Sequence, residues 1–457
     1  MRIYPEVQEI REIFLDKLCE EYRQNNNIDI ETCERRGVKR GLRNSDGTGI
    51  LAGLTNVCDV IGYERGENDE VIAIPGKLIY RGIDICDIVA EGLRCDRFMF
   101  EEVVWLLLLG NLPDKGTLKA FEELLDQHRE LPAGFPETQI MAAPSPDIMN
   151  KIARSVLAMY SYDENAEDTS LENIIQQSIN LIAGIPTMMV YAYQIKRHAY
   201  HHESLHLHYP KKQLSTAEHI LATYRPNQEF TREEAKLLDL CLVVHADHGG
   251  GNNSAFTTRV VSSTGTDTYS AIASSILSLK GPKHGGANLK VMSQLDEMLK
   301  TIKNVDDDEE VYDYLVKILK KEAGDRTGLI YGMGHAVYRI SDPRAQILKE
   351  NCENLAIEKG MEREYKMLCQ IEKLSEQAFC DVKSKCKNIC ANVDLYSGLV
   401  YRILGITEEL FTPIFAISRC AGWCAHRMEE VEFANRIIRP AYKFAGEMQE
   451  YVRLEDR

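Results

Sequence analysis

Apolar and polar positions repeat with two different periods along this chain of 457 residues. Residues 46–90 carry short apolar runs separated by turn residues, as in GLTNVCDVIGY and VIAIPGKLIYRG, which is typical of small β-hairpins. From about residue 98 almost to the end, apolar residues recur at helical spacing. The pattern therefore predicts a mainly α fold with a small β-hairpin element near the N-terminus.

Local start and stop signals delimit individual helices. The first 45 residues predict a helix followed by the basic segment ERRGVKRGLR. Residues 170–198 predict a long helix with Pro186 inside it. Thr231 and Glu234 predict a capping box that begins another helix. The remaining expected helices lie at 101–109, 118–129, 147–160, 267–280, 288–303, 306–321, 343–360, 361–386 and 413–433.

The charge balance and the apolar content narrow the class of protein. Lys and Arg number 54 against 70 Asp and Glu, which gives a net charge of −16. An acidic surface repels phosphate backbones, so no nucleic-acid partner is expected, and an anionic ligand needs a locally cationic site. The longest apolar run, residues 103–109, is too short to cross a bilayer, so no membrane partner is expected either.

The N-terminal residues and the cysteines predict a cytoplasmic protein. The segment MRIYPEVQEIREIF is charged throughout and lacks the apolar core of a signal peptide. The 13 cysteines include no C-x-x-C pair and show no disulfide framework, so reduced thiols are expected. No bound metal is expected.

The first segment with candidate chemistry is GPKHGGAN, residues 281–288. Gly281 and Pro282 end one expected helix, and another begins after Gly286, which places His284 in a tight turn between glycines. Such a turn allows a substrate to approach the backbone closely. An exposed histidine at a helix–helix corner explains the same pattern, and spacing does not decide between the two.

The second segment is GMGHAVYRISDPR, residues 332–344. His335 follows a G-x-G turn, and Arg344 lies in the first turn of the helix that Asp342 and Pro343 begin. A helix N-terminus favours anions, and an arginine there can donate two hydrogen bonds to one carboxylate. The alternative is a flexible loop, but the pairing of His335 with Arg344 favours a ligand site.

The third segment is ICANVDLYSGLV, residues 389–400, in which Asp394 is the only charged residue. Burial without a partner would raise the pKa of this carboxyl group, as a general base for a weakly acidic C–H requires. The position also suits a helix N-cap. The two roles are compatible, and the residues do not choose between them.

Two arginines and one histidine complete the candidate set. Arg419 is the sole charge in TPIFAISRCAGWCA, where burial is costly unless a core glutamate or a substrate carboxylate meets it. Arg439 lies in the apolar segment NRIIRP, and His248 ends a helix in HADHGGGNNS. On residue pattern alone, His248 is interpreted as a satisfied core histidine. Together the residues suit proton abstraction next to a carbonyl, with histidines stabilising charge on oxygen.

In this order, GPKHGGAN, GMGHAVYRISDPR, NVDLYSG and NRIIRP resemble the motif set of the citrate synthase family, as do LIYRGIDI and HADHGGGNNSAFTTRVVSSTGTDTYSAI. The resemblance runs from about Pro75 to the end. It implies a two-domain helical fold that closes over its substrates. After an N-terminal segment (1–74), a large domain (75–286 and 404–457) would hold a small domain (287–403) inserted within it.

The resemblance also implies an activity and the residues that perform it. Acetyl-CoA would condense with oxaloacetate, and citryl-CoA would be hydrolysed to citrate and CoA. Asp394 would remove the methyl proton, His284 would stabilise the enol, and His335 would polarise the keto carbonyl. His248, now reassigned from the core, would hold the oxaloacetate carboxylates with Arg344, Arg419 and a partner subunit's Arg439. The implied CoA-binding residues are Leu329, Ile330, Gly332, Arg339, Lys387 and Asn392.

Further implications of the resemblance are a homodimer with a shared active site and no cofactor, since the CoA thioester is itself a substrate. A higher oligomer stays open. Lys283 stands where the family more often has an apolar residue, and whether it perturbs His284 or reaches a CoA phosphate stays open. Gly249 replaces the acidic residue common at its position, which leaves the support of its loop open. The segment HAYHHESLHLH, residues 198–208, holds five of the 12 histidines and is interpreted as a solvated face or loop rather than a metal or pH-sensing site.

Two rival functions remain. The chain resembles 2-methylcitrate synthases in the same motifs. Propionyl-CoA differs from acetyl-CoA by one methylene, which allows a pocket only about 1–3 kcal/mol of discrimination. A rival of another class is a non-catalytic, CoA- or metal-responsive regulator with the same fold. Intact Asp394, His284 and His335 argue against a regulator, because a binding protein does not need a positioned base.

Overall fold

A computed structural model describes residues 5–26, 28–44, 46–68, 70–383, 388–434 and 436–457. The chain forms two units, Met1–Ala52 with Arg439–Arg457, and Gly53–Ile438. In the first unit, α1 (Pro5–Asn25) precedes the basic segment, and α2 (Ile30–Arg35) ends within its first residues. The Nη1 of Arg36 donates a hydrogen bond to the carbonyl of Phe444 at 2.7 Å, which joins the two ends of the chain within this unit.

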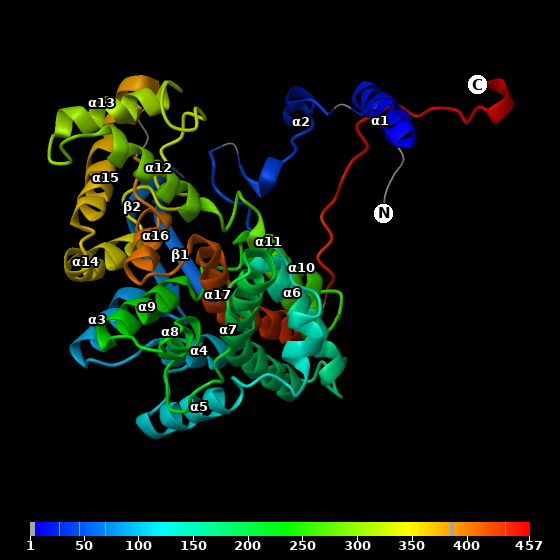
Figure 1. Ribbon diagram of the computed structural model, residues 1–457. Helices are drawn as coiled ribbons and strands as arrows, with labels where there is room; N and C mark the ends of the chain where they lie inside the picture. The colour runs from blue at the N-terminus through cyan, green and yellow to red at the C-terminus, as the bar shows by residue number, and fades with distance from the viewer. Residues whose placement is uncertain (1–4, 27, 45, 69, 384–387, 435) are drawn as a thin grey trace. The chain divides into compact units, whose positions relative to one another are not determined.

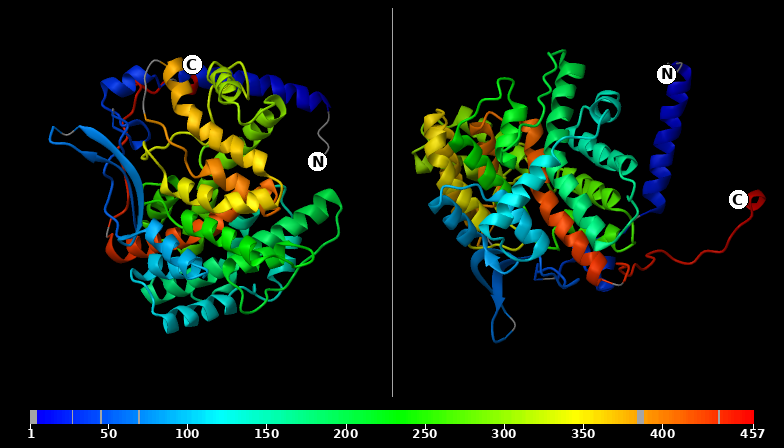
Figure 2. Two further views of the ribbon diagram at one scale, coloured as in Figure 1. Left: turned by 90° about the vertical axis from the view of Figure 1, so that its left-hand side faces the viewer. Right: turned by 90° about the horizontal axis from the view of Figure 1, so that it is seen from below.

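Three antiparallel strands of the Gly53–Ile438 unit form the β element predicted near the N-terminus. β1 (Cys58–Arg65) pairs with β2 (Val71–Tyr80), and β3 (Ile83–Asp84) pairs with the other side of β2. Cys58 lies opposite Tyr80 in the register, and both side chains are buried. The base of the hairpin therefore belongs to the core, whereas its far end extends beyond the helices (Figure 2).

Helices make up the rest of the Gly53–Ile438 unit, so the predicted mainly α fold is confirmed. In chain order they are α3 (Ile85–Arg94), α4 (Phe100–Leu109), α5 (Lys115–Gln127), α6 (Ile148–Met159), α7 (Leu171–His201), α8 (Thr216–Tyr224), α9 (Arg232–His245), α10 (Asn253–Ser262), α11 (Thr268–Lys280), α12 (Ala287–Thr301), α13 (Asp308–Leu319), α14 (Pro343–Glu358), α15 (Glu362–Lys383), α16 (Asp394–Ile403) and α17 (Phe411–Phe433). Short 3₁₀ or π turns lie at Arg40–Leu42, Pro136–Met141, Tyr160–Tyr162, Glu408–Leu410 and Leu454–Asp456.

Caps explain why many helices begin near their predicted residues. Thr231 and Glu234 form the predicted capping box of α9. Asp267 accepts the backbone N–H of Ser270 at the start of α11, and Asp342 accepts that of Arg344 at the start of α14. The sequence patterns did not predict α2, α3, α8 and α10, and they left α16 open. Helical structure extends to Phe433, and the described residues beyond it contain no α-helix.

The helices α12 to α16 pack on one another and gather at one side of the Gly53–Ile438 unit (yellow-green to orange in Figure 1). α17 is buried along most of its length and packs against α4, α7, α9, α10 and α11. This surrounding explains why its sequence is apolar on nearly all sides. The boundary of a small domain at 287–403 stays a prediction. No helix of the described residues is long and apolar enough to span a bilayer.

Candidate active site

Two loops that are far apart in the sequence form a short antiparallel pair. Met333 and Ala391 make an isolated β-bridge. The other bonds between the loops run from Gly334 N to Cys390 O at 2.8 Å, from Asn392 N to Gly332 O at 2.9 Å, and from Asn392 Nδ2 to Gly334 O at 2.9 Å. The pairing holds the loop that carries His335 against the loop that carries Asp394.

Hydrogen bonds fix the orientation of the His335 ring. Its Nδ1 accepts the backbone N–H groups of Val337 and Tyr338, each at 3.0 Å. The ring also stacks on the Tyr338 ring, with centroids 4.6 Å apart. Because Nδ1 accepts, the proton of the neutral imidazole is assigned to Nε2. His335 can therefore donate a hydrogen bond through Nε2.

His284 lies in the turn between α11 and α12, and its ring is half-buried rather than exposed at a corner. Its Nε2 accepts the backbone N–H of Ser254 at 3.3 Å, in the first turn of α10. Burial lowers the pKa of His284 to about 4, and the positive charge of Arg419 lowers it further in the same direction. The ring is therefore neutral at pH 7, and the bond at Nε2 assigns its proton to Nδ1.

Asp394 is the first residue of α16 and is half-buried. The N-cap residue is Val393, and the Asp394 carboxylate accepts no hydrogen bond from the described residues, so its side chain does not cap the helix. Burial raises the pKa of Asp394 to about 6, although the positive charges of Arg344 and Arg419 lower it. A carboxylate with this pKa is a stronger base than an ordinary aspartate.

Arg344 lies in the first turn of α14 and is buried. Its Nε and Nη2 bind Asp342 Oδ1 and Oδ2 at 3.0 and 2.7 Å, which is a bidentate ion pair. Burial alone would lower the pKa of Arg344, but Asp342 outweighs burial and raises it. Arg344 is therefore a permanent cation at a helix N-terminus, as the sequence predicted.

Arg419, on α17, is fully buried at 0% exposure. Its Nε donates to the carbonyl of His245 at 2.7 Å, and its guanidinium lies 4.7 Å from the ring of Phe415. Among the described residues, Nη1 and Nη2 have no hydrogen-bond partner. No glutamate meets the guanidinium there, which favours the second sequence interpretation, an anionic ligand.

His248 follows α9 and is buried, and its Nε2 has no hydrogen-bond partner among the described residues. It is therefore not the satisfied core histidine that its local pattern suggested. Its ring lies perpendicular to that of His335, with centroids 5.1 Å apart. Burial and the positive charge of Arg344 lower the pKa of His248 well below its ordinary value. The ring is a neutral polar group next to two cations.

The charge of Arg419 lowers the pKa of His284, His248 and Asp394, so all three lie within its electrostatic range. The structure thus brings together six of the predicted residues, which are His248, His284, His335, Arg344, Asp394 and Arg419. The predicted Arg439 belongs to the other unit, where it is exposed.

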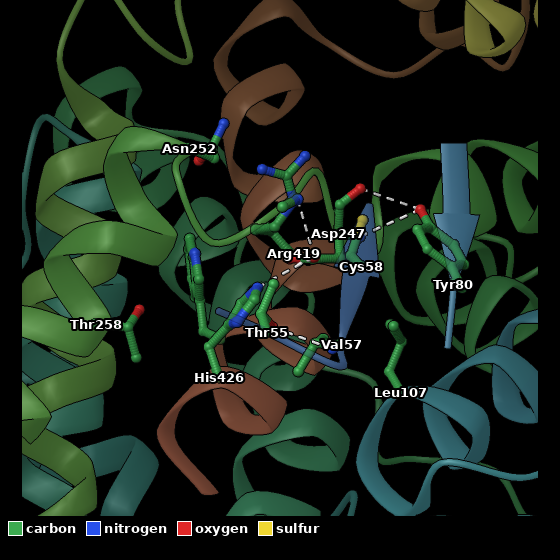
Figure 3. Close-up of polar contacts among 12 residues, drawn as sticks. Thr55, Val57, Cys58, Tyr80, Leu107, Asp247, Asn252, Thr258, Arg419 and His426 are labelled. Atoms are coloured by element: carbon green, nitrogen blue, oxygen red, sulfur yellow. Dashed lines mark hydrogen bonds and ion pairs between the residues drawn. The ribbon is translucent and has the colours of Figure 1, made fainter. Parts of the chain in front are cut away.

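The sequence interpretation missed several buried groups of this site. Tyr80 Oη donates to the carbonyls of Val243 and Asp247, each at 3.1 Å, and Figure 3 shows Tyr80 beside Asp247. Asp247 is fully buried, and so is His245, whose pKa burial lowers well below its ordinary value. The signal was present in HADH, because three polar residues end an apolar helix there.

The residues implied for CoA differ in their surroundings. Gly332 and Asn392 belong to the paired loops, and the Asn392 amide is engaged by Gly334 and Asp394. Leu329 is 50% exposed, whereas the Ile330 side chain is buried and can offer only its backbone to a ligand. The guanidinium of Arg339 lies 6.0 Å from the ring of Tyr63. Lys387 lies outside the described residues.

Three further features that the sequence analysis singled out lie away from the residues described above or depart from expectation. Lys283 is exposed, and the cation that affects the pKa of His284 is Arg419. Within the described residues, no three His, Cys, Asp or Glu side chains gather as metal ligands, and His198 and His208 engage Glu203 and Gln228. The prediction that all cysteines are reduced is wrong for Cys380, which is disulfide-bonded, because spacing along the chain does not show which cysteines fold together.

Comparison with known proteins shows which family this chain is similar to. The family model "Citrate synthase, C-terminal domain" matches residues 46–441. The citrate synthase of Haloferax volcanii is 36% identical over 81% of this chain and 90% of its own length. The 2-methylcitrate synthase of Shewanella oneidensis is 32% identical over 84% of this chain and 93% of its own.

The fold has a close structural counterpart as well. Citrate synthase from Thermoplasma acidophilum, solved in a ternary complex with carboxymethyl coenzyme A and oxaloacetate, superimposes with a TM-score of 0.73. That structure covers 92% of this chain and 99% of its own, at 26% identity. The family model, the relative from Haloferax volcanii and this likeness agree with one another. The chain belongs to the citrate synthase family.

Proposed function

We propose that this chain condenses acetyl-CoA with oxaloacetate and hydrolyses the citryl-CoA formed to citrate and CoA. The observation that carries the proposal is the pairing of Asp394, a base with raised pKa, with Arg419, whose two Nη atoms have no hydrogen-bond partner among the described residues. Asp394 can abstract a proton, and Arg419 can bind a carboxylate. Both are needed to join a thioester to a dicarboxylic keto acid.

Oxaloacetate would bind through its carboxylates to Arg344 and Arg419, with the neutral His248 as an additional polar contact. His335 would donate from Nε2 to the keto oxygen and make the keto carbon electrophilic. A preorganised donor of this kind stabilises the negative charge that develops on oxygen in the transition state.

Acetyl-CoA would be activated by Asp394 and His284. Asp394 takes a proton from the methyl group, while the Nδ1–H of His284 donates to the thioester oxygen and stabilises the enol. The enol carbon then forms a bond to the keto carbon of oxaloacetate, which gives citryl-CoA. Water hydrolyses the thioester and releases citrate and CoA. Leu329, Gly332, Arg339 and Asn392 are the described residues proposed to contact CoA, with Ile330 through its backbone.

The direct test is release of CoA thiol from acetyl-CoA in the presence and absence of oxaloacetate. The proposal requires release that depends on oxaloacetate and forms one citrate per thiol. Calorimetric binding of oxaloacetate without any thiol release would instead support the non-catalytic regulator.

The acyl specificity is a separate prediction, since a 2-methylcitrate synthase is similar over the same part of the chain. We expect kcat/KM for acetyl-CoA to exceed that for propionyl-CoA by about tenfold or more, the effect of one methylene in a fitted pocket. Thiol release with both acyl-CoAs at one oxaloacetate concentration measures the ratio. Faster turnover of propionyl-CoA would reassign the chain to the second function.

We further propose a homodimer whose domains close over the substrates and whose site receives Arg439 from the partner subunit; a cytoplasmic location stays a prediction. Arg439→Ala and Asp394→Ala subunits should each have low activity alone. In a mixed dimer, one of the two sites keeps both residues, so mixing should restore activity. If verified subunit exchange restores none, Arg439 does not act across the interface.

A further inference from the structure

Three consecutive residues at the C-terminal end of α9, His245 to Asp247, are each held by one face of α17. The Nε of Arg419 donates to the carbonyl of His245 at 2.7 Å, and the backbone N–H of Gly422 donates to the carbonyl of Ala246 at 3.1 Å. His426 Nε2 meets Asp247 Oδ2 at 3.1 Å. Positions 419, 422 and 426 share one helix face. His248 is the next residue in the chain, so α17 sets its position.

Gly422 allows the loop to lie directly on the helix backbone. A Cβ atom at this position would overlap Asp247 Oδ1 and the carbonyl oxygen of Ala246. Gly249 closes the loop with φ of +79°, and its N–H donates to Asp247 Oδ2 at 3.0 Å. The support that an acidic residue at 249 would have provided therefore comes from α17 and from Asp247.

His426 is itself fixed by a chain of buried charges. Its Nδ1 lies 2.8 Å from Arg259 Nη2, and an arginine can only donate, so Nδ1 accepts and Nε2 carries the proton. The proton therefore points at Asp247. Arg259 is held in turn by Glu429 and by Glu430, whose Oε2 lies 3.1 Å from Nη1. The imidazole has one tautomer and one orientation in this network.

Asp247 and Arg419 are two buried groups of opposite charge, and each keeps side-chain atoms without a hydrogen-bond partner among the described residues. Asp247 Oδ1 has no hydrogen-bond partner among the described residues, and the same holds for both Nη atoms of Arg419. Each of the two charges stabilises the charged form of the other, so they are close in space (Figure 3). A direct ion pair between them would occupy the guanidinium that the proposed function assigns to a substrate carboxylate.

We propose that His426 is a positioning residue for oxaloacetate: by holding Asp247, it fixes His248 and keeps the Arg419 guanidinium available to the substrate carboxylate. The inference rests on the proposed function, because it assigns the ligand of Arg419. It means that His426 on α17 and Arg259 on α10 affect oxaloacetate affinity without contacting the substrate themselves.

A pair of variants at one position tests the inference. The side-chain amide nitrogen of His426→Gln takes the place of Nε2 and can still donate to Asp247, whereas the shorter side chain of His426→Asn cannot. We expect His426→Asn to raise both the KM and the Kd for oxaloacetate about ten- to hundredfold, the effect of losing one hydrogen bond to a charged group. The kcat at saturating oxaloacetate and the KM for acetyl-CoA should change much less. His426→Gln should recover most of the affinity.

Ser418→Ala is the matched control, since Ser418 Oγ donates to the carbonyl of Leu242 within α9. It should lower the melting temperature without changing the oxaloacetate Kd. If His426→Asn does not fold, Arg259→Lys serves instead, because it frees His426 Nδ1 and should raise the oxaloacetate KM by a smaller factor.

Two results would overturn the inference, and they are distinguishable. In the first, wild-type protein condenses the substrates, and both His426 variants are less stable but bind oxaloacetate with the wild-type Kd. The network would then have only a structural role. Wild-type protein that neither binds oxaloacetate nor releases CoA would remove the proposed function and the inference together.

Discussion

Replacing Asp394 with alanine should lower kcat by about a thousandfold and leave the Kd for oxaloacetate nearly unchanged. The reason is that Asp394 is the base for the methyl group of acetyl-CoA, whereas Arg344 and Arg419 are assigned to the other substrate. Thiol-release kinetics and calorimetry with oxaloacetate alone measure the two quantities. A loss of oxaloacetate affinity as large as the loss of kcat would contradict the assigned role.

Asp394→Asn is the control for this prediction, because it keeps the shape of the side chain and removes the charge. Burial raises the pKa of Asp394 from 3.8 to about 6, so the ionised form costs native stability above pH 6 and costs nothing below pH 3.8. The cost is at most about 3 kcal/mol, at about 1.4 kcal/mol for each pKa unit. The asparagine variant should therefore melt higher than wild type at pH 8 but not at pH 4. Equal melting temperatures at pH 8 would mean that the carboxylate is not desolvated.

Replacing Arg419 with methionine should weaken oxaloacetate binding about 10²- to 10⁴-fold, the effect of losing two charge-assisted hydrogen bonds. The same change should cost the free enzyme little stability, because removing a desolvated guanidinium offsets the loss of its attraction to the buried Asp247 carboxylate. Its two Nη groups are buried without partners among the described residues, so methionine removes a desolvated charge. Calorimetry with oxaloacetate and thermal unfolding measure the two effects.

Arg427→Met is the matched control, since Arg427 is a second fully buried arginine of α17. Its three nitrogens bind Thr268 Oγ1 at 3.0 Å, Ser262 Oγ at 3.2 Å and the carbonyl of Thr266 at 2.8 Å. Methionine at position 427 leaves these three acceptors without a hydrogen-bond donor. The free energy of unfolding should therefore fall, while the Kd for oxaloacetate should stay unchanged. If Arg419→Met destabilised the protein as much as Arg427→Met, the guanidinium of Arg419 would have a structural role.

The local sequence determined most of the helices and the places where chemistry could occur. Capping residues such as Thr231 and Asp342 act within one helical turn, and the 3.6-residue period is itself a local property. The same reasoning placed His284 in a turn and Arg344 in the first turn of a helix. The resemblance in four ordered motifs added the family and the activity. These features depend on neighbouring residues, so a single sequence carries them.

Only the tertiary structure decided the burial, the protonation and the hydrogen-bond partners of each side chain. The sequence left open whether Asp394 caps a helix and whether Arg419 meets a glutamate, because burial and partners depend on segments far apart in the chain. Asn392 binds Gly334, 58 residues away, and His426 binds Asp247, 179 residues away. Protonation, tautomers and unpartnered groups follow from such contacts and from the low dielectric that packing creates. For that reason the residues proposed to contact the substrates could be named from the sequence, but the buried groups that support them, and the protonation and partners of all of them, could not.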